Sequence, residues 1–287
     1  MSVLFGLVTA LCWGLADFAV TIVSRRLTAF QATVGMHIGS VIFASILVIA
    51  TEALGEFPVT NLWPFVLIGL LGCAGYLAFF KALNLGPLSI VSPIVSGYAV
   101  ITVILAVLVL AERPGPLQIM AIIVVFAGVG LASTEFRSLK LSGLGTSWSR
   151  GILLAIVAMI MIGGYVFAIA YFADEFGWLV PIFLVRVFST VFFLGGTAAA
   201  RYPLLENVTW SLAIAMLLIG VVETSAYISL SFGVQIADTS LVATIASAYA
   251  LVPIALGFLF LGERPAVNQW VGITLVIAGL VLLGSTA

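Results

Sequence analysis

Five ionisable residues stand inside long apolar stretches of the sequence. They are Asp17, His37, Lys81, Arg186 and Glu223, and of these Lys81, near the end of its stretch, can extend its side chain to the membrane interface. A charge near the centre of a bilayer costs about 2.5–3.5 kcal/mol on insertion scales, so such residues persist mainly where the protein uses them. Glu223 shares a helical face with Tyr227, and Asp17 shares one with Trp13. These residues are therefore the first candidates for a site that binds or moves a charged solute.

The residue types support two interpretations. In the first, Glu223 and Asp17 bind a substrate amine or a coupling proton, and Arg186 binds a substrate carboxylate or sets the pKa values of the two acids. In the second, Arg186 neutralises a carboxylate to hold helices together, and His37 is a hydrogen-bonded interior residue. Glu223 aligns with Gly72 in an internal repeat described below, so the acid is not a structural feature that the two copies share.

Aromatic side chains accompany these charges. The candidates to line a binding cavity are Trp13, Tyr76, Tyr98, Tyr165, Tyr227 and Tyr249. Such a lining suits a small amphipathic solute, or an organic cation held partly by cation–π contacts. A zwitterionic amino acid would satisfy both the acids and Arg186, whereas a cation would satisfy only the acids. Alternatively, the rings fill space in a helix bundle.

The composition places the chain in a membrane. Hydrophobic residues make up 63% and charged residues 7% of its 287 residues, and the mean hydropathy is +1.34, so too few polar residues remain to cover a water-soluble globule. Each membrane helix needs about 20 apolar residues. The apolar runs cover residues 3–24, 30–51, 61–83, 88–110, 116–134, 150–171, 178–200, 209–232, 239–261 and 266–284. We predict an all-α integral membrane protein with ten transmembrane helices.

One stretch of the sequence occurs twice. Residues 85–114 return as residues 236–265, shifted by 151 positions, and 12 of the 30 aligned residues are identical. The matches at this shift include Ser96 with Ser247, Tyr98 with Tyr249, Tyr76 with Tyr227, and Glu112-Arg113-Pro114 with Glu263-Arg264-Pro265. The chain is therefore interpreted as a duplication.

Five spans per copy force the second copy to enter the membrane from the opposite side. We predict two inverted-topology five-helix repeats around a central cavity, residues 1–134 and 150–287, joined by a loop at residues 135–149. Inverted repeats are a recurring design of secondary transporters, whose substrate site lies near the midplane between the repeats. A channel or a structural protein built by duplication is the less favoured alternative.

The duplicated unit, the Leu-Cys-Trp-Gly of residues 11–14 and the Glu-Arg-Pro ends resemble the drug/metabolite transporter (DMT) superfamily, EamA type. The second copy has the family's Gly-Glu-x-Pro at residues 262–265, whereas the first has Ala111 in place of the glycine. The resemblance covers the whole chain. It implies alternating-access transport of small metabolites, often export of amino acids or related compounds, and leaves the substrate open. A proton-coupled carrier of organic cations, of multidrug or quaternary ammonium type, is the alternative.

The Glu-Arg-Pro segments are interpreted as structural. Proline is tolerated in the first turn of a helix but obstructs continuation of the preceding one, so each Pro marks the start of a new span. The adjoining Glu and Arg, at the membrane edge, are expected to be solvated or to pair with each other. Ser89, Ser92 and Ser96 share a small-residue face of the kind that lets membrane helices approach closely.

The sequence argues against other function classes. One His and no paired-carboxylate, nucleophile or phosphate-loop motif disfavour an enzyme or a primary pump, and we expect no metal and no cofactor. A net charge of −1 without a basic run disfavours nucleic acid as a partner. We expect a small-molecule substrate, the lipid bilayer and protons as partners, and a monomer or weak dimer.

The charge count and the family resemblance predict opposite orientations in the cell (inner) membrane. Loops after odd-numbered spans hold Arg25, Arg26, Arg137, Lys140, Arg150, Arg201 and Arg264. The other side holds Arg113 alone, so the positive-inside rule places both termini outside. Relatives are usually drawn with both termini inside.

Overall fold

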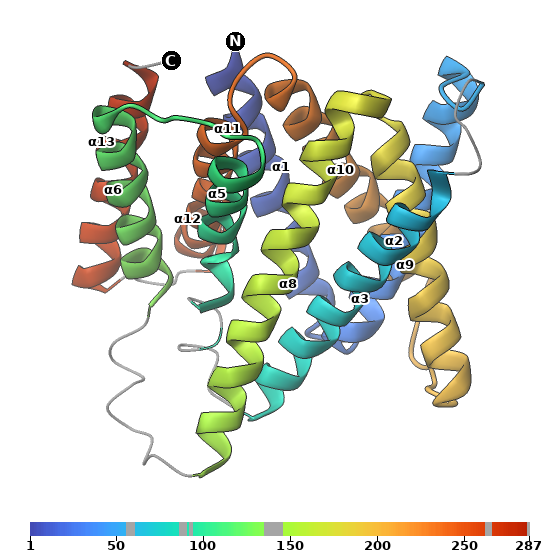
Figure 1. Cartoon of the computed structure of the whole chain (residues 1–287). Helices are drawn as coiled ribbons and strands as arrows, with labels where there is room; N and C mark the ends of the chain where they lie inside the picture. The colour runs from blue at the N-terminus through green and yellow to red at the C-terminus, as the bar shows by residue number, and fades with distance from the viewer. Residues whose placement is uncertain (56–60, 86–90, 92–93, 135–145, 262–265, 286–287) are drawn as a thin grey trace.

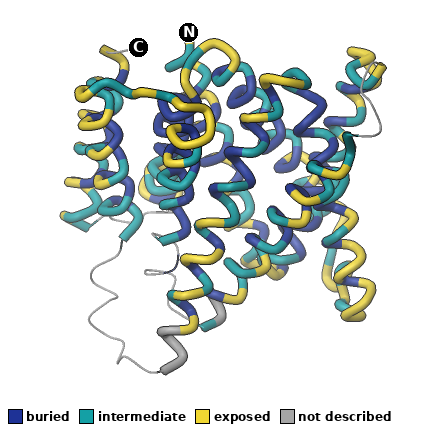
Figure 2. The backbone as a smooth tube through the Cα atoms, viewed as in Figure 1, coloured by how far each residue is buried: buried dark blue, intermediate teal, exposed yellow. Residues whose placement is uncertain are grey.

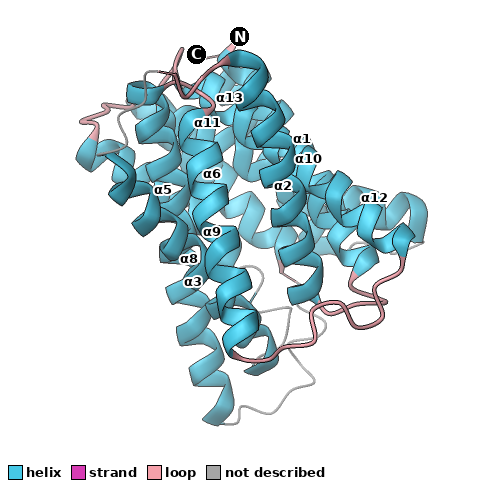
Figure 3. Cartoon of the chain, turned by 90° about the vertical axis from the view of Figure 1, so that its right-hand side faces the viewer, coloured by secondary structure: helices cyan, strands magenta, loops and turns pink. Residues whose placement is uncertain are grey.

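The computed structural model describes the chain except for residues 56–60, 86–90, 92–93, 135–145, 262–265 and 286–287. Every regular element of the described part is a helix (Figure 3). Within these ranges nine helices are long and apolar enough to cross a membrane, and Ile94–Val109 is a shorter apolar helix. They fall on the ten predicted spans, so the predicted all-α membrane fold is confirmed.

The helices follow one another along the chain, with both termini at the same end of the bundle (Figure 1). They are α1 (Ser2–Val23), α2 (Ala29–Thr51), α3 (Leu62–Leu85), α5 (Tyr98–Val109), α6 (Pro116–Ser133), α8 (Thr146–Phe176), α9 (Val180–Ala199), α10 (Trp210–Val234), α11 (Thr239–Ala246), the 3₁₀ turn η2 (Ser247–Ala250), α12 (Leu251–Leu261) and α13 (Val267–Gly284). The last helix of each half shows the repeat directly, because both ends of α13 lie 151 residues after those of α6.

The two halves are interlocked rather than set side by side. α1 of the first half packs against α10 of the second, and α8 of the second packs against α3 of the first. α2 contacts both α9 and α10. Buried and exposed residues alternate along the helices (Figure 2), and many of the exposed residues are large and apolar, as expected of helices in contact with lipid. The centre of the bundle is therefore built from both repeats.

Glycines allow α6 and α13 to pack closely. A β-carbon at Gly128 would lie 2.7 Å from the backbone nitrogen of Val276, and one at Gly279 would lie 3.0 Å from that of Val125. Only a residue without a side chain allows the two backbones to approach this closely. This pair forms a tight antiparallel unit at one side of the bundle (Figure 1).

A capping box fixes the start of α2. The Thr28 side chain accepts from the Gln31 N–H at 3.1 Å, and the Gln31 side chain accepts from the Thr28 N–H at 3.0 Å. The Gln31 amide also donates to the carbonyl of Leu204 at 3.0 Å, between α9 and α10. These bonds tie α2 to the second half and set the register of the α2 residues that reach the centre.

Some predicted features lie outside the described residues: Ser89, Ser92 and the second Glu-Arg-Pro at residues 263–265. Of the serine positions that are described, Ser96, Ser240 and Ser247 are buried.

Candidate functional site

Arg186 of α9 and Glu223 of α10 form a buried ion pair within the second half. Arg186 Nη2 donates to Oε1 of Glu223, and the two side chains are 0% and 5% exposed. The other carboxylate oxygen accepts from the Ser40 hydroxyl of α2 at 3.2 Å. Each charge is thus compensated within the protein, which is what permits both to be buried in an apolar bundle.

His37 of α2 completes this polar cluster. Its Nδ1 lies 2.9 Å from the Thr33 carbonyl, so that nitrogen carries the proton, and Nε2 accepts from Arg186 Nη1 at 3.1 Å. Tyr76 and Phe193 pack edge-on against the ring, with centroids 5.6 and 4.9 Å away. His37 therefore helps to position the Arg186 guanidinium.

The Arg186 guanidinium also lies over an aromatic ring. Its central carbon is 4.6 Å from the ring centroid of Tyr227, one helical turn after Glu223. Tyr165 stands edge-on to the same ring at 6.1 Å. Among the Arg186 nitrogens, Nε is the one that is buried without a hydrogen-bond partner in the described part of the chain. Little of this guanidinium remains free to meet a second anion.

Trp13 of α1 is surrounded by three tyrosines. Its ring centroid lies 5.1 Å from Tyr227, 6.2 Å from Tyr98 and 6.2 Å from Tyr249, edge-on in each case. Tyr98 and Tyr249, the pair matched by the repeat, are 6.0 Å apart. We call these four residues the aromatic cluster. Both halves contribute to it, and it is largely buried.

Asp17 follows Trp13 by one turn of α1 but is exposed. Its carboxylate makes no ion pair or hydrogen bond with the described residues, yet it interacts electrostatically with Glu223, Tyr98 and Tyr249 on other helices. An exposed side chain within reach of three other helices faces the inside of the bundle. Asp17 is therefore an uncommitted acid beside the aromatic cluster.

Small residues bring these groups together. At Gly220 of α10, an added β-carbon would fall 2.5 Å from the Ser40 backbone nitrogen, so α2 and α10 touch at their backbones and Ser40 meets Glu223. At Gly72 of α3, an added β-carbon would fall 2.6 Å from the ring of Tyr165. Because glycines have no side chain, Gly220 and Gly72 let the neighbouring groups come close enough to form the polar cluster.

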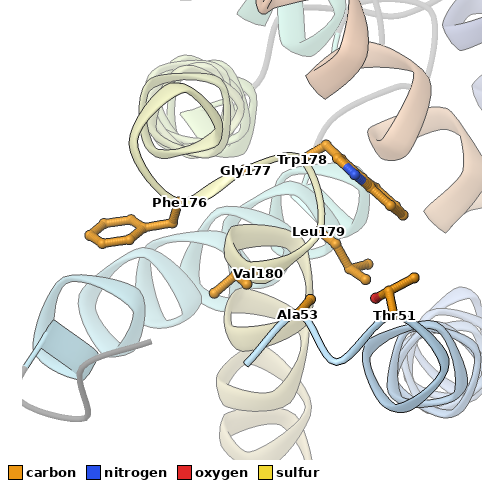
Figure 4. Close-up of a pocket in the computed structure, with 7 residues that line it drawn as sticks. All are labelled: Thr51, Ala53, Phe176, Gly177, Trp178, Leu179 and Val180. Atoms are coloured by element: carbon orange, nitrogen blue, oxygen red, sulfur yellow. The ribbon is translucent and has the colours of Figure 1, made fainter. Parts of the chain in front are cut away.

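The pocket shown in Figure 4 lies away from this centre. It is lined by Thr51, Ala53, Phe176, Gly177, Trp178, Leu179 and Val180, where α2 ends and α8 turns into α9. None of the predicted site residues lines it. Within the described residues, no group of three His, Cys, Asp or Glu side chains could hold a metal ion.

Two functional candidates were not anticipated from the sequence. Ser40 is one small polar residue in an apolar run, and nothing in its spacing marks it as a partner of Glu223. Glu112 was expected to be solvated or paired with Arg113. Instead, its carboxylate accepts the backbone N–H of Thr239 at 2.6 Å and of Ser240 at 3.0 Å, so that expectation is wrong. A carboxylate offers two acceptors, which two adjacent free N–H groups satisfy.

Comparisons with protein-family models and with solved structures both found matches to this chain. A family model described as the EamA-like transporter family matches residues 1–134 and 149–285. One solved structure, titled only as the crystal structure of a protein, superimposes with a TM-score of 0.80 at 18% identity, covering 100% of this chain and 97% of that one. At this identity the likeness shows the fold alone. The sequence has no significant match among curated proteins. The chain belongs to the EamA-like transporter family and is a membrane transporter of the drug/metabolite transporter superfamily.

Proposed function

We propose that this transporter is a secondary active carrier. It moves a small amphipathic metabolite, such as an amino acid or a related compound, across the plasma membrane by alternating access, as an exporter or an exchanger. One observation carries the proposal: charged and aromatic residues of both inverted repeats meet in the centre of the bundle. Trp13 of the first half touches Tyr227 of the second, beside the Arg186–Glu223 pair. Secondary transporters bind their substrates at such repeat interfaces.

A second candidate is a carrier of organic cations or amines coupled to protons. It is favoured by the unequal state of the charges, because Arg186 is bound to Glu223 whereas Asp17 is exposed and has no ion-pair partner in the described part of the chain. A cationic group would meet the Asp17 carboxylate and nearby ring faces directly. The carboxylate of a zwitterion would have to compete with Glu223 for Arg186. Under this candidate, a proton on Asp17 or Glu223 displaces the cargo.

Counterflow into proteoliposomes tests both candidates. Purified protein is reconstituted with an internal amino acid, primary amine or tetraalkylammonium ion, and entry of the labelled compound is followed with and without a pH gradient. We expect saturable exchange for at least one class. Ohmic current without exchange would instead identify a passive channel, and transport of neutral zwitterions alone would exclude the cation candidate.

Substitutions at the two acids sharpen this test. Asp17→Asn should lower cation exchange at least about tenfold without changing thermal stability, since the exposed carboxylate has no partner to lose. Asp174→Asn, another exposed acid, is the matched control. Glu223→Gln should abolish transport or its response to pH while leaving the protein folded. Unchanged flux and pH dependence in the Glu223 variant would remove Glu223 from the mechanism.

A further inference from the structure

Glu112 is held in a defined position at the end of α5. The preceding residue, Ala111, has φ 55°, in the left-handed region that favours glycine, and glycine stands at the matching position 262 of the sequence. The Glu112 N–H then donates back to the Ala106 carbonyl at 3.4 Å. This turn aims the carboxylate away from its own helix and across to the other half of the protein.

The receiving element is the first turn of α11. Asp238, which precedes this helix, makes no side-chain capping bond. The N–H groups of Thr239 and Ser240 lack partners within their helix, and Glu112 accepts both. The positive end of the helix dipole adds to the attraction. Because all of α11 is buried, from Thr239 to Ala246, loss of this cap would leave donors in a poorly hydrated place.

The same two helices carry the matched tyrosines of the aromatic cluster. α5 begins at Tyr98, and the run from α11 into η2 reaches Tyr249. A 12-residue helix such as α5 is about 18 Å long, so Glu112 and Tyr98 lie at its opposite ends. α5 and α11 pack together between these points. The Glu112 contact and the aromatic contact are therefore two ends of one helix–helix seam.

The bundle end that contains Glu112 is closed by further contacts. The Ser229 hydroxyl donates to the Phe5 carbonyl at 2.8 Å, and the rings of Phe5 and Phe232 stack at 5.9 Å. Farther along α1, toward the opposite end, Asp17 is exposed. α1 and α10 are therefore packed together on the side of the termini, and the exposed acid of α1 lies toward the other side.

We propose that Glu112 is a gating residue, whose hold on the first turn of α11 keeps the terminal side of the transporter closed and must release for that side to open. This inference rests on the proposed alternating access. It assigns the Glu of the Glu-Arg-Pro segment a role in positioning a helix of the opposite repeat, without contact with the cargo.

Cysteine accessibility tests the gate without any cargo. In a background carrying Cys12→Ala and Cys73→Ala, one reporter is Val242→Cys, in the first turns of α11 at a position 0% exposed. The other is Val20→Cys, near Asp17 on the opposite side. Glu112→Ala should raise the maleimide reaction rate at position 242 at least about tenfold, the scale of a lost hydrogen bond to a charged group, and should lower the rate at position 20. Glu112→Gln should be intermediate, and Arg113→Gln, at the exposed next residue, should change neither rate.

Opposite changes at the two reporters distinguish a gate from a simple helix cap. If Glu112→Ala leaves the rate at position 242 unchanged in folded protein, the gate is refuted. If both rates rise together and the unfolding temperature falls, Glu112 is only a stabilising cap and the proposal is equally refuted. Because alkylation needs no transport, failed counterflow would count against the proposed function, whereas failed alkylation changes would count against the gate.

Discussion

The two repeats have the same order of helices but differ in the side chains that they contribute to the centre of the bundle. At the shift of 151 residues, Arg186 and Glu223 of the second half correspond to Gly35 and Gly72 of the first. Gly72 does not merely lack a charge, since its missing side chain leaves the space that the Tyr165 ring fills. The two repeats therefore have the same helices but contribute differently at these two positions. The second repeat supplies the charged side chains, and the first supplies glycines, one of which leaves space for the Tyr165 ring.

The first half has a different exposed group. Asp17 and Trp13 correspond to Ala168 and Gly164, so the second half has neither an acid nor an indole at the matching positions. The first half therefore presents an exposed carboxylate, and the second half a buried, compensated ion pair. If Asp17 binds the cargo as proposed above, cargo recognition and internal stabilisation are divided between the repeats, and this division can be tested residue by residue.

The largest expected effect comes from breaking the ion pair of the second half. Arg186→Met leaves the Glu223 carboxylate buried without its partner and should lower the free energy of unfolding by about 3–5 kcal/mol, measured by denaturation in detergent micelles. The double variant Arg186→Met/Glu223→Met removes both charges and should recover most of this loss. If the single variant is as stable as the parent protein, the Arg186–Glu223 pair does not stabilise the fold.

Filling the space in the first half should be the next largest effect. Gly72→Ala places a methyl group 2.6 Å from the Tyr165 ring and should cost about 1–3 kcal/mol of stability. Gly164→Ala is the matched control, because its methyl group would only touch Leu71 at 3.5 Å. We expect this control to be neutral or slightly stabilising. Equal effects of the two variants in the same assay would show that Gly72 does not make room for Tyr165.

His37 offers a smaller change, because the second half has Phe188 at the corresponding position. His37→Phe keeps the ring but removes the acceptor for Arg186 Nη1, and should cost about 1–1.5 kcal/mol. In the Arg186→Met background the same substitution should cost much less, since the donor is gone. Identical costs in both backgrounds, measured as a double-mutant cycle, would show that the His37–Arg186 contact contributes nothing.

The smallest effect is expected at Asp238, beside Glu112. Partial burial and the neighbouring Glu112 carboxylate raise the pKa of Asp238 above its usual value. Since the folded protein raises this pKa, ionisation of Asp238 as the pH increases through it disfavours the folded state. Asp238→Asn should therefore raise the unfolding temperature at neutral pH by about 1 °C, and by less below pH 4, where Asp238 is protonated in both states. A decrease at neutral pH would contradict the crowding of the two carboxylates.

Much of this fold could be predicted from the sequence, because apolar runs and a duplicated segment are local, repeated signals. They gave the ten helices, their ends within a few residues and the expectation of inverted repeats. The residues of the centre were also predictable as a set, since an ionisable residue in an apolar run is conspicuous. Arg186, Glu223 and His37 do come together, and Asp17 lies within electrostatic reach.

Which atoms meet could not be predicted, because partners lie on helices far apart in the chain. Ser40 meets Glu223 across 183 residues, and Glu112 meets Thr239 across 127. The position of Glu112 close to Pro114 correctly indicated a helix boundary. It did not indicate that the Glu112 carboxylate accepts hydrogen bonds from the first turn of α11. Such contacts depend on the crossing of helices, and helix crossings depend on where glycines allow close approach.

The crossed pairing of α1 with α10 and of α3 with α8 has a consequence for synthesis of the protein. When the ribosome has finished α6, neither α1 nor α3 has met its main partner, and Glu112 has no helix end to hold. The newly inserted first half must wait in the lipid, or with an insertion chaperone, until α8 and then α10 arrive. Two separately expressed halves should therefore stabilise each other in the same cell, whereas either half alone should be degraded.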